Sequence, residues 1–309
     1  MPVLFHHDLA VAVLGSGSRG NCTYIGDGQH GLLVDCGLST RQVTRRMEAI
    51  GLGGAPIDAV LVTHEHTDHV GGVRVLAKSV HKRIGQPIPV FMSAGTQRAL
   101  HPRLLPERVD NVSAGRPFRV GDWDVEPFTV PHDTVDPVGY VVDLGPLRVG
   151  VFTDLGCVTR LVQEKLLSVD IAVLEFNHDL EMLVEGPYPW PIKQRIRSRH
   201  GHLSNEQAED LLTTCARAGR LKDVILGHLS EENNSPEKAL LAASRAVCRA
   251  GRKDIGVHVA RQAEAIDPVR CQVPMEARPG RPASVATARV PSQAPLLEAE
   301  AEQEVLFES

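Results

Sequence analysis

The chain has 309 residues, of which 42% are hydrophobic and 23% are charged. These fractions are typical of a globular protein with a sizeable core, and they exclude a chain that is disordered throughout. The first ten residues contain no basic start followed by an apolar run, so we expect neither a secretory signal nor a membrane anchor. The six cysteines are scattered and form no Cys-x-x-Cys pair, which favours free thiols in a reducing cytoplasm over a disulfide framework.

The formal net charge of −5 argues at first against a nucleic-acid partner. Part of this charge lies near the end of the chain, because the sequence from Asp267 onward is rich in proline, alanine and glutamate and has no apolar period. We therefore predict one domain at residues 1–265, followed by a disordered acidic tail at 266–309. Without this tail the body is nearly neutral, so it can bind nucleic acid only through a local basic patch and bound metal ions.

Short apolar runs alternate with amphipathic stretches from about residue 8 to residue 265. The apolar runs predict strands at residues 9–14, 22–25, 31–35, 59–62, 123–129, 139–143, 148–153, 171–175 and 224–226. The amphipathic stretches predict helices at residues 40–50, 70–79, 95–100, 160–167, 205–218 and 236–250. Two helix starts are well marked, since Ser204 and Gln207 form a capping box and Ser235 precedes Pro236. The order of elements suggests two sheets between layers of helices.

A glycine-rich segment at residues 15–21 joins the first two predicted strands. Its sequence, Gly-Ser-Gly-Ser-Arg-Gly-Asn, is compatible with a tight turn or with a loop that cradles phosphate. A phosphate cradle normally precedes a helix, whereas a strand follows this loop. The tight turn is therefore the favoured interpretation, and the phosphate loop stays open.

The segment at residues 63–69, Thr-His-Glu-His-Thr-Asp-His, follows a buried strand and brings His64, His66, Asp68 and His69 close together in sequence. Imidazole nitrogen and carboxylate oxygen suit zinc above all, with manganese or iron as alternatives. Four donors are too many for one open catalytic ion that also needs a water molecule. The spacing therefore predicts two divalent metal ions.

Further donors recur where later strands end. Asp35, His132, Asp154 and His228 each follow an apolar run, although any one of them alone would be a weak signal. Together with the segment at 63–69 they provide a third histidine for one ion, a third ligand for the other and a carboxylate between them.

The order of these motifs resembles the metallo-β-lactamase superfold, an α/β protein built as an αββα sandwich, over about residues 9–260. The resemblance implies that His64, His66 and His132 hold the first metal, that Asp68, His69 and His228 hold the second, and that Asp154 bridges the two. It also implies that Asp35 orients the histidine loop through hydrogen bonds and does not bind metal itself.

Within this superfold the chain is similar to the YycJ/WalJ-like group of bacterial nucleases. The matching segments are residues 14–21, 175–179, 186–189, 193–205 and 228–230 with the pair 233–234. The resemblance implies a 5′ to 3′ exonuclease that acts on DNA in preference to RNA, with a hydroxide bridging the two ions as nucleophile. An RNA-processing nuclease of the same fold and a thioester or small-ester hydrolase stay open as alternatives.

A second histidine, His202, lies in a Gly-His-Leu-Ser tetrapeptide identical to the one around His228, but it precedes a capped helix. It is similar to the Gly-His-[Ser/Thr] element of the transfer-RNA 3′-processing branch, which implies that His202 protonates the leaving oxygen while Glu175 orients it. The alternative is that His202 only packs and caps the helix.

The densest basic run follows Tyr188 and includes Lys193, Arg195, Arg197 and Arg199. Such a run is often a solvated helix face. Next to the proposed acid it could instead hold backbone phosphates while Tyr188 or Trp190 stacks on a base.

Overall fold

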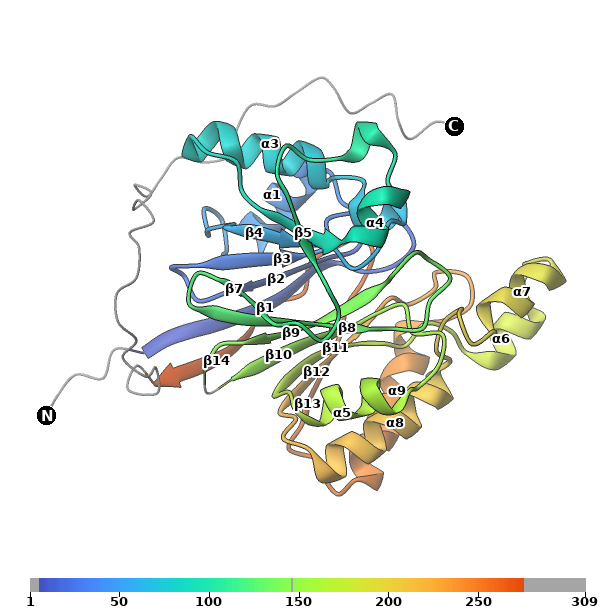
Figure 1. The fold of residues 1–309 in the computed structure, drawn as a ribbon. Helices are drawn as coiled ribbons and strands as arrows, with labels where there is room; N and C mark the ends of the chain where they lie inside the picture. The colour runs from blue at the N-terminus through green and yellow to red at the C-terminus, as the bar shows by residue number, and fades with distance from the viewer. Residues whose placement is uncertain (1–5, 146, 275–309) are drawn as a thin grey trace, which may run out of the picture.

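The computed structural model describes residues 6–145 and 147–274 and forms two sheets packed face to face between outer layers of helices (Figure 1). This arrangement confirms the predicted αββα sandwich. No helix in the described part of the chain is long and apolar enough to cross a membrane.

The first sheet has the strand order β14-β1-β2-β3-β4-β5-β6. Its strands are β1 (His6–Gly15), β2 (Cys22–Gly26), β3 (Gly31–Val34), β4 (Ala59–Leu61), β5 (Val90–Ser93), β6 (Val109–Val112) and β14 (Val269–Pro274). Its outer side carries α1 (Thr40–Ala49), α2 (Thr67–Val70), α3 (Val73–Ile84), α4 (Ala94–Ala99) and the 3-10 turn η1 (Pro102–Leu104). From β3 to β6 neighbouring strands are parallel, so their carboxyl ends reach one edge of the sheet.

The second sheet has the order β13-β12-β11-β10-β9-β8-β7. Its strands are β7 (Phe118–Val120), β8 (Trp123–Thr129), β9 (Val138–Asp143), β10 (Arg148–Phe152), β11 (Ile171–Glu175), β12 (Asp223–Gly227) and β13 (Gly256–Val259). Helices α5 (Arg160–Leu167), α8 (Asn205–Ala218) and α9 (Pro236–Arg249) cover its outer face. Strands β10 to β13 are parallel, and their carboxyl ends supply a second row of loops at the same edge of the sandwich as the loops that follow β3 and β4.

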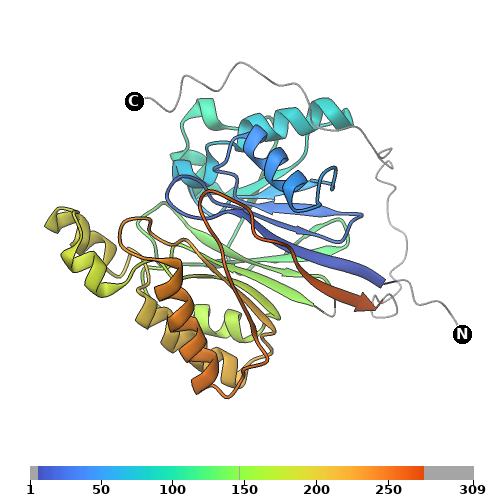
Figure 2. The ribbon, with the colours of Figure 1, turned by 180° about the vertical axis from the view of Figure 1, so that it is seen from behind.

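Two short helices, α6 (Leu180–Glu185) and α7 (Trp190–Ile196), leave the body of the molecule as a projecting hairpin (Figures 1 and 2). Of the residues in these two helices, only Leu183 and Lys193 are buried. The sequence pattern did not predict either helix, because a hairpin that buries so little apolar surface shows almost no helical period.

The core lies in three layers that follow from the alternation of apolar residues. Side chains such as Val11, Trp123 and Tyr140 fill the space between the sheets. The opposite faces of the same strands pack against α1 and α3 on one side and against α5, α8 and α9 on the other. Because both faces of the central strands are buried, these strands read as short continuous apolar runs.

The helix starts formed as the sequence indicates. Ser204 accepts a hydrogen bond from the backbone of Gln207, whose side chain accepts one from the backbone of Ser204, and Ser235 caps α9.

The predicted strands and helices agree with those in the structure to within a few residues, but the sequence pattern missed five strands. These are β5, β6, β7, β13 and β14.

The predicted domain boundary at residue 265 is wrong. Strand β14 lies beyond it and pairs antiparallel with β1, with Leu9 opposite Cys271 and Val11 opposite Val269. This strand belongs to the sandwich although its sequence alternates weakly, because pairing with β1 satisfies its backbone. The rest of the predicted tail, from residue 275, lies outside the described residues.

Candidate metal centre

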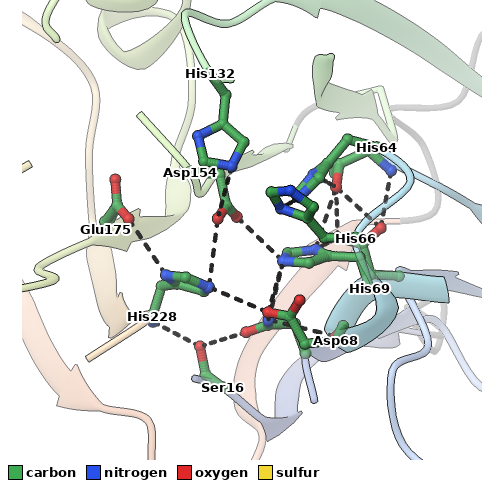
Figure 3. Close-up of polar contacts among 12 residues, drawn as sticks. Ser16, His64, His66, Asp68, His69, His132, Asp154, Glu175 and His228 are labelled. Carbon is green, nitrogen blue, oxygen red and sulfur yellow. Dashed lines mark hydrogen bonds and ion pairs between the residues drawn. The ribbon is translucent and has the colours of Figure 1, made fainter. Parts of the chain in front are cut away.

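The proposed ligands from both sheets converge at one edge of the sandwich (Figure 3), and the orienting residue Asp35 lies at the same edge. Asp35 directly follows β3, and His64 lies three residues after β4. On the other sheet Asp154 lies two residues after β10, and His228 directly follows β12. All four side chains are at least 95% buried, so loops that are far apart in sequence meet in one recess.

Three of these residues have an unusual backbone conformation. Asp35, Asp154 and His228 have φ angles of 59°, 59° and 55°, in the left-handed region that residues other than glycine rarely adopt. Each left-handed residue turns the chain sharply at the end of its strand. Backbone strain of this kind costs on the order of 1–3 kcal/mol per residue, and it concentrates at functional sites.

The first proposed ligand set, His64, His66 and His132, forms a cluster of imidazoles. The rings of His64 and His132 lie 5.0 Å apart between centroids, and those of His66 and His132 lie 5.2 Å apart. One ring nitrogen from each residue falls within 4.8 Å of the others, close enough to share one ion. Nδ1 of His132 lies 3.2 Å from the carbonyl oxygen of Gly201, which leaves Nε2 facing the cluster.

The second proposed set, Asp68, His69 and His228, meets the same distance limit. Asp68 Oδ2 lies 3.3 Å from Nε2 of His69 and 3.7 Å from Nε2 of His228. Asp68 and His69 belong to the short helix α2, whereas His64 and His66 precede it in extended chain. The change from extended to helical backbone inside the motif divides its four donors between two sets.

Asp154 lies between the two sets. Its carboxylate oxygens are 3.3 Å from Nε2 of His69, 3.4 Å from Nε2 of His228 and 3.7 Å from Nε2 of His132. No other described carboxylate comes this close to imidazoles of both sets. This is the position that a bridging ligand requires.

Asp35 lies behind the cluster, in contact with its backbone and with one ring. Its Oδ1 accepts a hydrogen bond from the backbone N–H of Thr63 at 2.8 Å, and its Oδ2 lies 2.8 Å from Nδ1 of His69. The contact to His69 favours a proton on Nδ1 and leaves Nε2 free to bind a metal. Asp35 therefore holds the loop and one ring, as the orienting role requires.

Several polar atoms at the centre of the cluster are buried, and their nearest charged neighbours are one another. Nε2 of His132, Nε2 of His228 and Oδ2 of Asp154 make no hydrogen bond to any described residue. Buried polar atoms are normally paired, because an unpaired one costs about 1–3 kcal/mol. Imidazole nitrogens and carboxylate oxygens that face one another in this way fit divalent metal ions, which bind the deprotonated form of each group.

The two sets differ in their electrostatics. Burial opposes a charge on His228, but Asp154, Asp68 and Glu175 around it raise its pKa to about 10. In the first set burial dominates, and it lowers the pKa of both His64 and His132. Without a bound ion, His228 therefore carries a proton at neutral pH, while His64 and His132 are neutral and ready to bind.

Comparison with known proteins identifies the family. Residues 30–228 match the family described as the beta-lactamase superfamily domain. The chain belongs to this superfamily.

Two proteins named as exodeoxyribonucleases are similar to the chain over most of its length. Exodeoxyribonuclease WalJ of Streptococcus pneumoniae is 36% identical over 254 residues, which cover 80% of this chain and 90% of that protein. Exodeoxyribonuclease YycJ of Bacillus anthracis is 34% identical over 263 residues, which cover 84% of this chain and 96% of that protein. The likeness to the YycJ/WalJ-like group is thereby confirmed.

The fold agrees with a solved superfamily structure. The metallo-β-lactamase fold protein YhfI of Bacillus subtilis matches with a TM-score of 0.61 at 15% sequence identity, covering 84% of this chain and 99% of that one. At this level of identity the likeness concerns the fold alone.

Beside the proposed metal ligands, the proposed general acid, His202, lies next to its proposed orienting residue, Glu175. Nδ1 of His202 lies 2.7 Å from Oε1 of Glu175, and the same oxygen lies 3.3 Å from Nδ1 of His228. Glu175 is fully buried, and its other oxygen accepts hydrogen bonds from the backbone of Leu155 and Leu203. Burial raises its pKa, but the two imidazoles outweigh burial and lower it, so Glu175 is a fixed anion between them.

A cavity of about 260 Å³ opens in front of the cluster. Histidines and aspartates that could bind metal line this cavity together with apolar and cationic side chains. The lining residues are Ser18, His66, Asp68, Asp133, Asp154, Ile192, Arg195, Ile196, Gly201, His202 and His228. Arg195 forms an ion pair with Asp133 at 2.5 Å, which anchors α7 to the loop that carries His132.

The basic run is only partly available to a substrate. Arg195, Arg197 and Arg199 are exposed, and Tyr188 is half-buried in the link between α6 and α7. Lys193 is buried, and its ammonium donates hydrogen bonds to the carbonyl oxygens of Val184 and Gly186 at 2.6 and 2.7 Å. The prediction that Lys193 contacts substrate is therefore wrong, because its charge stabilises the end of α6.

Sequence patterns missed several residues that contact the cluster. Asn177 donates a hydrogen bond to the carbonyl oxygen of His228 at 2.9 Å, and Asp133 lies 3.6 Å from His132. Asn21 and Ser16, from the glycine-rich segment, contact the second set directly. A neutral amide or hydroxyl carries no metal-ligand signature, so only its position in space indicates this role.

Proposed function

We propose that this chain is a divalent-metal phosphodiesterase, most specifically a 5′ to 3′ DNA exonuclease. The observation that carries the proposal is its likeness to two exodeoxyribonucleases over nearly their whole length. The convergence of the His and Asp side chains beside an open cavity supports the same conclusion.

The two groups of His and Asp side chains described above would hold two metal ions. His64, His66 and His132 would hold one ion; Asp68, His69 and His228 would hold the other; and Asp154 would join them. Mixed nitrogen and oxygen donors suit zinc first, with manganese or iron as alternatives. Bound divalent ions supply Lewis acidity for the phosphate and activation of a water nucleophile.

The protein itself supplies the proton for the leaving group. His202 lines the cavity beside Asp154, and its Nδ1 is held by the Glu175 anion. This contact fixes the ring and directs its other nitrogen away from Glu175, which lies on the buried side. A ring held in this way can protonate a departing sugar oxygen, a step worth roughly 10²- to 10⁴-fold in rate.

The substrate face runs from the cavity along α7. Ile192, Arg195 and Ile196 line the cavity, and Arg197 and Arg199 follow at the exposed end of the helix. Trp190 is 56% exposed on the same helix, so it offers an aromatic face for a base beside the half-buried Tyr188. Phosphate contacts from three arginines predict a log–log salt slope of only about −2 to −3.

The six cysteines are unpaired in the structure, which is compatible with a reducing, cytoplasmic location.

The proposed function can be tested by incubating purified, metal-loaded protein with duplex and single-stranded DNA and RNA labelled at the 5′ or the 3′ end. We expect stepwise release of nucleotides from the 5′ end of DNA and loss of this activity in His66→Ala. Equal or faster cleavage of RNA would favour the RNA-processing alternative, and hydrolysis of thioesters alone would overturn the proposal.

A further inference from the structure

The glycine-rich segment between β1 and β2, residues 15–21, lies against the second proposed ligand set. The side chain of Asn21 is buried, and its Nδ2 donates a hydrogen bond to Oδ2 of Asp68 at 3.1 Å. The same nitrogen lies 3.0 Å from Nε2 of His69. Oδ1 of Asn21 accepts a hydrogen bond from the backbone N–H of Gly17 at 2.9 Å, which identifies the nitrogen side of the amide as the one that faces the cluster.

Ser16 completes the contact with this set (Figure 3). Its hydroxyl oxygen accepts a hydrogen bond from the backbone N–H of His228 at 2.7 Å and lies 3.4 Å from Oδ1 of Asn21. One turn therefore reaches Asp68, His69 and His228. Within the described residues, neither Asn21 nor Ser16 has a hydrogen bond to His64, His66 or His132.

The turn is held from behind by Gln262, in the loop between β13 and β14. Gln262 accepts a hydrogen bond from the backbone N–H of Arg19 at 2.7 Å and donates one to the carbonyl oxygen of Gly20 at 3.0 Å. Gly17 has a φ angle of 141°, and a Cβ there would lie 2.7 Å from Oε1 of Gln262. The glycine is needed for its backbone conformation, whereas the Gln262 side chain would have to move to accommodate a larger residue.

These contacts have a direct chemical consequence for the ligands. An amide N–H can only donate, so Asn21 presents a donor to Oδ2 of Asp68 and to Nε2 of His69, while Asp35 accepts from Nδ1 of His69. A metal bound at Nε2 would replace the contact to His69 and would leave the Asn21 amide on Asp68 alone. The same amide fixes the rotamer of the Asp68 carboxylate, and Ser16 fixes the backbone of His228. Partners of this kind typically change metal affinity by about 10- to 100-fold.

We propose that Ser16 and Asn21 form a support that sets the affinity of the second metal site and leaves the first site unaffected. A tight turn with no further role would leave metal affinity unchanged. A phosphate cradle does not fit, because a strand follows the loop and the side chains of Ser16 and Asn21 are directed inward, to the ligands. The inference rests on the proposed division of the ligands, but it does not depend on the nuclease activity, because metal binding is measured without substrate.

The test separates the two sites genetically and measures Mn²⁺ and Zn²⁺ binding by calorimetry. His132→Ala should leave only the second site, and Asp68→Ala only the first. Adding Asn21→Ala should weaken binding about 10- to 100-fold in the His132→Ala background and by less than about twofold in the Asp68→Ala background. Ser16→Ala should show the same selectivity, and Co²⁺ absorption spectra of the same proteins identify the remaining site.

Arg19→Ala is the matched control within the same turn, because its side chain is exposed and pairs with Glu231 instead of the cluster. It should leave both affinities unchanged. Equal losses in the two backgrounds, or no loss in either, would overturn the proposed support, and circular dichroism shows whether each variant is folded. If His132→Ala and Asp68→Ala each still bound two ions, the division of ligands in the proposed function would fail instead.

Discussion

The two proposed metal sites differ in the chemical type of their ligands and in the residues that surround them. The first uses three imidazoles, and burial keeps His64 and His132 neutral. The second adds the carboxylate of Asp68 to two imidazoles and is surrounded by Asp35, Glu175, Asn21 and Ser16. In the first site, burial keeps the imidazoles uncharged and ready to bind a metal. In the second site, a network of polar partners holds the ligands. The second site should therefore respond more strongly to pH and to substitutions around it.

The largest effect is expected where the sites meet. Asp154→Ala removes the carboxylate that lies within 3.7 Å of imidazoles from both sets. Turnover should fall to background and most of the second metal should be lost, as metal analysis after desalting and a nuclease assay would show. Asp122→Asn, on the turn between β7 and β8, is a control that should change neither. Two ions retained at full occupancy in Asp154→Ala would contradict the bridging role.

His202 tests whether the acid can be separated from the metals. His202→Ala should keep both ions and slow cleavage of a DNA phosphodiester by roughly 10²- to 10⁴-fold. Hydrolysis of bis-nitrophenyl phosphate should lose far less, because nitrophenolate leaves without a proton. Glu175→Gln should mimic this more weakly and should also weaken the second site, since Glu175 contacts His228 as well. Equal losses on both substrates would exclude the general-acid role.

The pH dependence of metal binding should distinguish the sites. Because the pKa of His228 is raised to about 10 and that of His69 is raised as well, a metal at the second site must displace at least one proton, and its affinity should increase at least about tenfold per pH unit between pH 7 and 9. The pKa values of His64 and His132 are lowered, so these ligands need no deprotonation above neutral pH. Calorimetry of His132→Ala and Asp68→Ala in buffers with different ionisation enthalpies counts the protons. Proton release at the first site alone would reverse the assignment.

The smallest effect is expected from the end of the chain. Ending the protein at residue 265 removes β14 from β1 and loosens the strand that leads into the turn at residues 15–21. We expect a lower thermal midpoint and a loss of second-site affinity below the tenfold typical of a direct partner. Ending the protein at residue 274 keeps this strand and is the matched control. Identical midpoints for the two truncations would show that β14 contributes nothing to stability.

The sequence predicted those parts of the site that carry a chemical signature. Histidine and aspartate after apolar runs are rare enough to stand out, and the structure brings all seven proposed ligands to one edge. Lys193 and Asn21 show where this reasoning stops. A lysine in a basic run resembles a phosphate ligand until its ammonium is found against carbonyl oxygens, and a buried asparagine resembles any turn residue until its partners are known.

The sequence by itself determined the alternation of strands and helices, the helix caps and the identity of the donors, because each depends on residue type and local spacing. Only the tertiary structure decided that β14 returns to β1, that α6 and α7 project from the body, and that the glycine turn supports one metal site. These features depend on contacts between segments up to about 260 positions apart in the chain, such as Leu9 with Cys271. Such contacts are fixed by backbone hydrogen bonding and close approach, which leave little trace in any single stretch of sequence.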